Sequence, residues 1–169
     1  MRRIVLLIIL VFVCSSTTTA TPCDSIELGD GEKGKVILTQ REVDGGFQEL
    51  IFVHQGPNAN EKIARISFSG SKEISCYFPS ITLLKAKDWG WHVAWVSTAN
   101  QGVFYARVDG AAWVSSLPKK LSRESAQLVS LTESKGKLTI SINYSPEQKK
   151  QEEKFVSEDE GRNWDKLTP

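Results

Sequence analysis

The sequence predicts an all-β protein of one domain, and three observations support this prediction. Short runs rich in Val, Ile, Phe and Trp recur along the chain, separated by turns rich in Gly, Asn, Asp and Pro. None of these runs shows the apolar spacing of an amphipathic helix. The chain has 169 residues, of which 40% are hydrophobic and 24% charged, a composition typical of a single globular domain.

Residues 1–20 have the organisation of a secretory signal peptide. A basic start precedes an unbroken apolar run of ten residues and a small polar tract that ends at Ala20. Ten apolar residues are too few to span a bilayer as a helix, so no stable membrane span is expected. Lipidation at Cys14 is the alternative, but Val13 stands where a lipoprotein signal usually has a small residue. We therefore expect a secreted or periplasmic protein whose single domain covers residues 21–169.

Removal of residues 1–20 changes the charge and the cysteine count. Two arginines leave, so 19 basic residues remain against 20 acidic ones and the formal net charge moves from +1 to −1. Nucleic acid is therefore not an expected partner, because its binding requires concentrated positive charge. Cys23 and Cys76 remain after cleavage. In an oxidising compartment we expect them to form a disulfide, and two unpaired thiols are the alternative.

The strand-like runs fall into three sets of three. They cover residues 36–39, 50–53 and 63–68; residues 81–84, 91–96 and 103–108; and residues 127–131, 138–142 and 154–157. Arg65 and Arg107 hold the same place in similar tetrapeptides 42 residues apart. This spacing suggests a repeated unit in which the two arginines occupy matching positions.

The clearest motif lies near the C-terminus. Ser157, Asp159, Gly161 and Trp164 follow the spacing Ser-x-Asp-x-Gly-x-x-Trp. This spacing predicts a tight corner between antiparallel strands, because the aspartate can accept bonds from backbone N–H groups just after it and the glycine tolerates positive φ. We expect the Trp164 ring to fold back over the turn and pack on the strand that enters it.

A degenerate copy of the motif stands 51 residues earlier, measured from tryptophan to tryptophan. Gly110 and Trp113 keep the Gly-x-x-Trp spacing. Asp109, however, is adjacent to the glycine, and Ala106 takes the place of the serine. The sequence therefore predicts two related corners.

The intact motif resembles the Asp-box, or BNR repeat, of sialidases and related β-propeller proteins, where it joins the two outer strands of a blade. The resemblance implies a partial β-propeller of about three antiparallel blade-like units, and an irregular β-sandwich is the alternative. It also implies a structural role for the box residues, since the box lies away from the catalytic pocket in that family. Closed propellers typically have four to eight blades. Three units would leave open sheet edges, which a homodimer could cover.

A sialidase-like enzyme would require features that the sequence does not assemble. The family's Arg-Ile-Pro motif is absent, and the spacing of the arginines and tyrosines assigns none of them to one pocket. Arg65 and Arg107 are candidates for ligand binding, with exposed strand positions as the alternative. The two histidines, His54 and His92, have no metal-ligand spacing, so neither a metal nor a cofactor is predicted.

An aromatic cluster is the best candidate for a binding surface. Trp89 and Trp91 lie close together, and exposed rings could stack on a sugar or anchor a protein. Core packing is the alternative for Trp91, while Trp89 precedes the strand and is expected to be the more exposed ring. We therefore predict a non-enzymatic binding module for a protein or glycan. The alternative is a glycoside hydrolase, or a subunit that completes one, which would need a concave acidic site.

Overall fold

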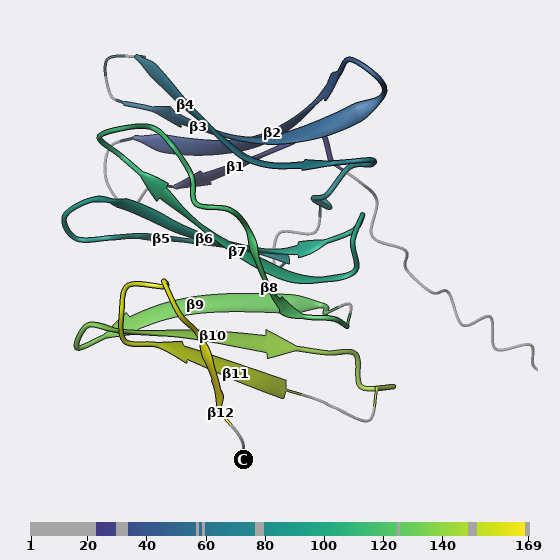
Figure 1. Ribbon diagram of the computed structural model, residues 1–169, viewed down its shortest axis with the longest axis vertical. Helices are drawn as coiled ribbons and strands as arrows, with labels where there is room; N and C mark the ends of the chain where they lie inside the picture. Colours follow the sequence, from purple (N-terminus) through teal and green to yellow (C-terminus); the bar gives the residue numbers. More distant parts are fainter. Residues whose placement is uncertain are drawn as a thin grey trace, which may run out of the picture.

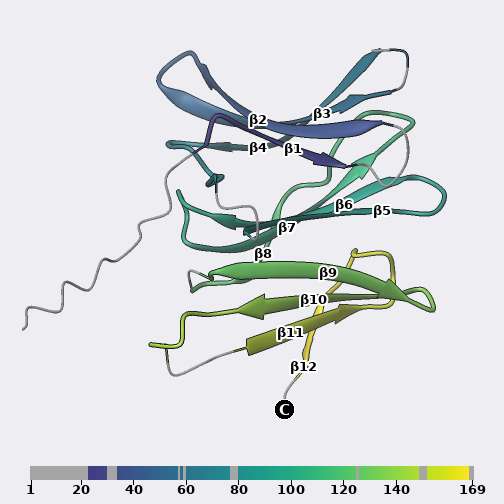
Figure 2. The ribbon, with the colours of Figure 1, turned by 180° about the vertical axis from the view of Figure 1, so that it is seen from behind.

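The structure is a computed structural model that describes residues 23–29, 34–56, 58, 60–76, 80–124, 126–148 and 152–167. The predicted signal peptide lies outside these residues. Within them the protein is all-β and contains no helix, as the sequence predicted. Twelve strands form three four-stranded antiparallel sheets. Figures 1 and 2 show these sheets stacked one upon another, with no strand bridging them into a closed barrel.

Each sheet is a simple meander of strands that follow one another in the sequence. The first contains β1 (Ser25–Gly29), β2 (Lys35–Val43), β3 (Phe47–Gln55) and β4 (Glu61–Ser69). The second contains β5 (Ile81–Lys85), β6 (Gly90–Ser97), β7 (Gly102–Asp109) and β8 (Lys119–Ser122). The third contains β9 (Leu128–Ser134), β10 (Lys137–Asn143), β11 (Glu152–Ser157) and β12 (Asp165–Leu167).

The second sheet is the middle layer, and its strand β6 is buried along its whole length. Successive side chains of a strand point to opposite faces of the sheet. Val93 and Trp95 therefore enter the core shared with the first sheet, which includes Phe52. Ala94 enters the core shared with the third sheet, together with Ile140. A strand covered on both faces needs a continuous apolar run, which explains the composition of β6.

The number of repeated units was predicted correctly, but their boundaries were wrong. The three predicted sets correspond to β2–β4, β5–β7 and β9–β11, so the short edge strands β1, β8 and β12 were missed and the first set is shifted by one strand. Arg65 lies in the fourth strand of its sheet and Arg107 in the third, so they do not occupy matching positions. The error arises because alternation with a period of two looks the same in every strand.

A disulfide joins Cys23 to Cys76, as predicted. It ties the segment before β1 to the connection between β4 and β5 across a sequence separation of 53 residues. In the chain-entropy account, closing a loop of this size stabilises the fold by roughly 4 kcal/mol. In the part of the chain that the structure describes, no helix has the length and apolar character needed to cross a membrane.

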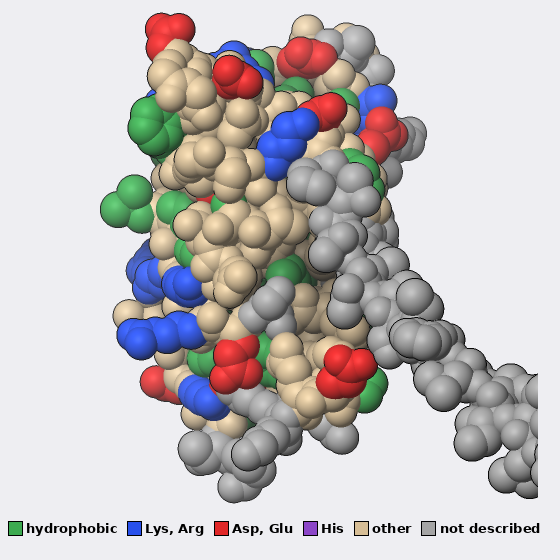
Figure 3. Space-filling view, turned by 90° about the vertical axis from the view of Figure 1, so that its right-hand side faces the viewer, with side chains coloured by type: hydrophobic (Ala, Val, Ile, Leu, Met, Phe, Trp, Pro, Cys, Tyr) green, Lys and Arg blue, Asp and Glu red, His purple; other side chains and the backbone are tan. Residues whose placement is uncertain are grey.

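The meander pattern gives the stack two different ends. In the second and third sheets, the first and third turns lie at one end, on the left in Figure 1, which we call the corner face. The β5–β6, β7–β8, β9–β10 and β11–β12 connections all lie there. Among the described side chains at the opposite end, Figure 3 shows charges of both signs and only scattered hydrophobic groups.

Candidate functional site

The 157–164 corner, which joins β11 to β12, is held by its own side chains. Asp159 Oδ1 accepts hydrogen bonds from the Asn163 backbone N–H at 2.8 Å and from the Ser157 hydroxyl at 2.7 Å. The Gly161 backbone N–H donates to Ser157 Oγ at 2.8 Å. The Asn163 backbone N–H, followed by the Ser157 hydroxyl, lowers the pKa of Asp159 to about 2. The charged aspartate thus holds the turn closed.

The same corner docks onto the second sheet. Gly161 has φ +80°, and a Cβ at this position would overlap the Tyr105 hydroxyl of β7. The Trp164 ring contacts Tyr105 edge to face, with the ring centroids 4.8 Å apart. Trp164 therefore joins its corner to the neighbouring sheet, and it also packs against the core that includes Phe155 of the entering strand.

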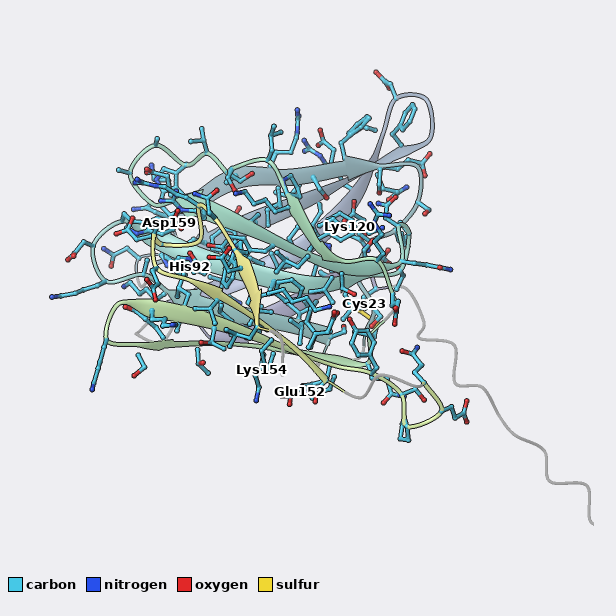
Figure 4. The ribbon with its side chains drawn as sticks, turned by 60° about the horizontal axis from the view of Figure 1, so that its bottom comes forward. Cys23, His92, Lys120, Glu152, Lys154 and Asp159 are labelled. Atoms are coloured by element: carbon cyan, nitrogen blue, oxygen red, sulfur yellow. A yellow bond between two sulfur atoms is a disulfide. The ribbon has the colours of Figure 1, made fainter. Side chains whose placement is uncertain are left out.

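A polar and aromatic cluster lies beneath this corner. The Tyr105 hydroxyl lies 2.6 Å from His92 Nδ1, and the Trp89 ring meets the His92 ring edge to face at 4.9 Å. The Arg107 guanidinium lies 4.4 Å from the centroid of Trp89 and 3.7 Å from a carboxylate oxygen of Glu160. Figure 4 shows His92 and Asp159 in this region.

Two groups of this cluster have shifted pKa values. Burial, aided by the positive charge of Arg107, lowers the pKa of His92 to about 4. Burial also raises the pKa of Tyr105. Both side chains are therefore neutral at physiological pH, and their hydrogen bond lies inside the stack.

The 109–113 corner, which begins the β7–β8 connection, has a simpler arrangement. Asp109 Oδ1 accepts the backbone N–H groups of Ala111 and Ala112, both at 2.8 Å, and these bonds lower its pKa. Trp113 itself has positive φ, at +57°. Its ring stacks on His54 of β3 with the centroids 5.7 Å apart. Each corner tryptophan thus contacts the third strand of the preceding sheet.

Two hollows open on the corner face. The first has a volume of about 410 Å³, and its lining includes Lys85, Lys87, Asp88, Trp89 and Gly110. The Gly110 backbone N–H donates to the Trp89 carbonyl at 2.7 Å, which fixes the backbone beneath this hollow. The second has a volume of about 530 Å³ and lies against the β9–β10 turn and Glu158.

The predicted binding residues separate into three environments. Trp89 is half-buried and lines the first hollow beside Arg107. Trp91 is also part of the lining, but it packs among core aromatic rings and only 5% of its surface is exposed. Arg65 lies away from both, on the first sheet, where it forms a 2.6 Å ion pair with Glu49.

Sequence reasoning missed a buried group in the third sheet. The Tyr144 hydroxyl donates to the carboxylate of Glu153 and lies 2.6 Å from the Ser122 hydroxyl. Lys166 Nζ forms an ion pair with the other oxygen of Glu153. Tyr144 and Glu153 are both buried, so this tyrosine–glutamate pair is closed to a sugar substrate. The two residues flank the β10–β11 connection, which is the only sequence signal that could have linked them.

No family model, curated protein or solved structure matches this chain. In the described ranges, no group of His, Cys, Asp and Glu side chains could hold a metal ion.

Proposed function

We propose that this chain is a secreted, non-enzymatic binding module that holds a glycan on its corner face. In this proposal the three sheets are blades of a partial β-propeller, and the 157–164 and 109–113 corners are an intact and a degenerate Asp-box. The stacked four-stranded meanders and the cross-sheet position of both tryptophans support this fold assignment. The disulfide and the signal-like first 20 residues support secretion.

The hollow beside Trp89 is the observation that carries the proposal. Its volume of about 410 Å³ lies within the range common for small-ligand sites, roughly 300–1,000 Å³. The lining combines the aromatic surface of Trp89 with hydrogen-bonding groups on Lys85, Lys87 and Asp88. A sugar offers a matching combination of an apolar ring face and peripheral hydroxyl groups. Contacts with His92 and Arg107 hold the Trp89 ring in place before the ligand arrives.

The chemistry of the site favours binding over hydrolysis. A glycosidase needs a carboxylic acid that stays protonated until it reaches the glycosidic oxygen. Two carboxylates line the hollow: Asp88 is exposed to solvent, and Asp109 accepts two backbone N–H groups that lower its pKa. The buried Tyr144–Glu153 pair is not part of the described lining of this hollow. Glycoside hydrolysis is therefore the second candidate function. For the binding module, a protein is the alternative to a glycan as ligand.

A glycan panel tests the proposal. We expect the exported protein to bind a subset of immobilised oligosaccharides and Trp89→Ala to weaken that binding at least roughly tenfold, as loss of a central aromatic contact does at other binding sites. Lys87→Ala is the second variant, because its side chain can be removed without touching the Trp89 packing. Lys154→Ala, in β11 of the third sheet, is the matched control and should bind normally.

Three outcomes would contradict the proposal. Absence of binding to every glycan would exclude a glycan-binding role for the corner face. Binding that survives both Trp89→Ala and Lys87→Ala would place the site elsewhere. Release of free sugar from a bound oligosaccharide would establish the hydrolase reading instead.

A further inference from the structure

The two outermost faces of the stack differ in chemistry. In the first sheet, Leu50 and Phe52 point into the core, so the alternate positions Ile51 and Val53 point outward, where neighbouring side chains leave them 5% and 9% exposed. Cross-strand pairing places Ile63 beside Val53 on the same outward face. The outward positions of the third sheet are mainly polar; they include Ser130, Thr132, Thr139, Ser141 and Asn143.

Large apolar groups on the outward face of the first sheet are open to solvent. Phe47, Ile63 and Phe68 are 44%, 56% and 55% exposed. The rings of Phe47 and Phe68 stack with centroids 4.9 Å apart and extend the apolar surface toward the β2–β3 hairpin. Large exposed apolar groups gathered on one face of a sheet commonly mark a contact with another macromolecule.

The charges on this face are balanced. Glu49 is buried and binds both Arg41, at 2.9 Å, and Arg65, at 2.6 Å. Lys35 and Glu27 form a second ion pair at 2.9 Å. Glu61 is the one further charged residue at a described outward position. The described residues of the face therefore carry three cations and three anions. Two such faces can therefore approach each other without net repulsion.

The size of the face suits a dimer. Strands β2, β3 and β4 have nine residues each. At roughly 3.3 Å per residue and about 4.8 Å between strands, the outline of the face is on the order of 500 Å². Its accessible surface is larger than its outline because side chains project from it, and a stable interface takes about 800 Å² from each partner.

We propose that the outward face of the first sheet packs against the same face of a second copy, forming a two-fold symmetric dimer. A two-fold interface requires a surface that complements itself, and this face has exposed apolar groups on either side of the Glu49 ion pairs and is neutral overall. Pairing two half-propellers into a ring would instead place this apolar face on the Ser- and Thr-rich face of the third sheet. Packing of face on face also differs from the strand-edge pairing that the sequence suggested. The proposal is independent of the glycan site.

The mass of the exported protein in solution tests the dimer. Light scattering should give twice the chain mass, and Ile63→Lys and Phe68→Lys should each raise the dimer dissociation constant at least roughly tenfold, because each places an unpaired charge in an apolar part of the interface. Leu167→Lys is the matched control, since Leu167 is 48% exposed on the outward face of the third sheet. This variant should remain a dimer.

Two results would overturn the inference. One is a monomeric wild-type protein at every concentration, and the other is a dimer that Ile63→Lys and Phe68→Lys leave intact. Unfolding midpoints serve as the check on folding, because both substitutions are at exposed positions and should leave an isolated chain as stable as before. Dissociation by Leu167→Lys alone would also overturn it, because the contact would then involve the third sheet.

Discussion

The 157–164 and 109–113 corners join equivalent strands of neighbouring sheets, yet they reach their shapes differently. Both use an aspartate to accept backbone N–H groups, and both send a tryptophan to the third strand of the preceding sheet. In the first corner the left-handed residues are Glu160 and Gly161, whereas in the second it is Trp113 itself. The aspartate therefore suffices to form the turn, while the position of the left-handed residue decides how closely the corner docks.

Gly161→Ala should have the largest effect of the substitutions considered. Its Cβ would add left-handed strain and overlap the Tyr105 hydroxyl, for a combined loss of about 3 kcal/mol in unfolding free energy. Gly136→Ala is the matched control, because Gly136 has φ +76° but no atom within 4 Å of its Cβ position. The control should lose about 1 kcal/mol. Equal losses in urea unfolding would show that docking on Tyr105 contributes nothing.

At Trp113 and Trp164, substitution by alanine and by glycine should rank in opposite order by loss of stability. Either Trp113→Ala or Trp164→Ala should lose about 2 kcal/mol, since both rings are half-buried. Trp113→Gly should be less harmful than Trp113→Ala, because glycine relieves the strain of positive φ. Trp164→Gly should be more harmful than Trp164→Ala. Urea unfolding of the four variants checks this order, and the same order at both positions would contradict it.

Stability should depend on pH through His92, which lies beneath the 157–164 corner. Its pKa is lowered to about 4 in the folded protein, against an ordinary value of 6.5. Between these values the unfolded chain binds the proton and the folded chain does not, so stability falls as pH drops from about 6.5 to about 4. We expect a loss on the order of 2 kcal/mol. His92→Gln keeps a polar partner for Tyr105 and should remove this dependence of stability on pH. If the dependence is unchanged in the variant, it arises from other titratable groups.

The aspartates should give the smallest effects. Asp159 has its pKa lowered to about 2, so its contribution is present above the unfolded pKa near 4 and is lost as pH falls toward 2. Asp159→Asn should lower the urea midpoint at pH 6, and the difference from wild type should shrink by pH 3. Asp109→Asn should show a smaller difference, because Asp109 lacks the serine and asparagine side-chain partners of Asp159. A larger effect at Asp109 would reverse the ranking of the two corners.

Features that depend on local chemistry could be predicted from the amino-acid sequence. Alternating apolar runs and turn residues predicted an all-β chain with three units, and the two cysteines among residues 21–169 predicted the Cys23–Cys76 pair. The spacing around Asp159 specified a closed turn, because its partners lie within four residues. Short edge strands such as β12 escaped detection because its three residues are all exposed and carry no apolar pattern.

The assignment of strands to sheets and the contacts between distant side chains depend on how the chain packs in three dimensions. The contacts of Trp89 with Arg107, of Trp164 with Tyr105 and of Tyr144 with Glu153 depend on sheet pairing and stacking. The exposure of Ile63 and Phe68 has the same origin, because an apolar strand residue looks identical in sequence whether or not another sheet covers it. Stacking buried both faces of the second sheet and left one apolar face of the first sheet uncovered.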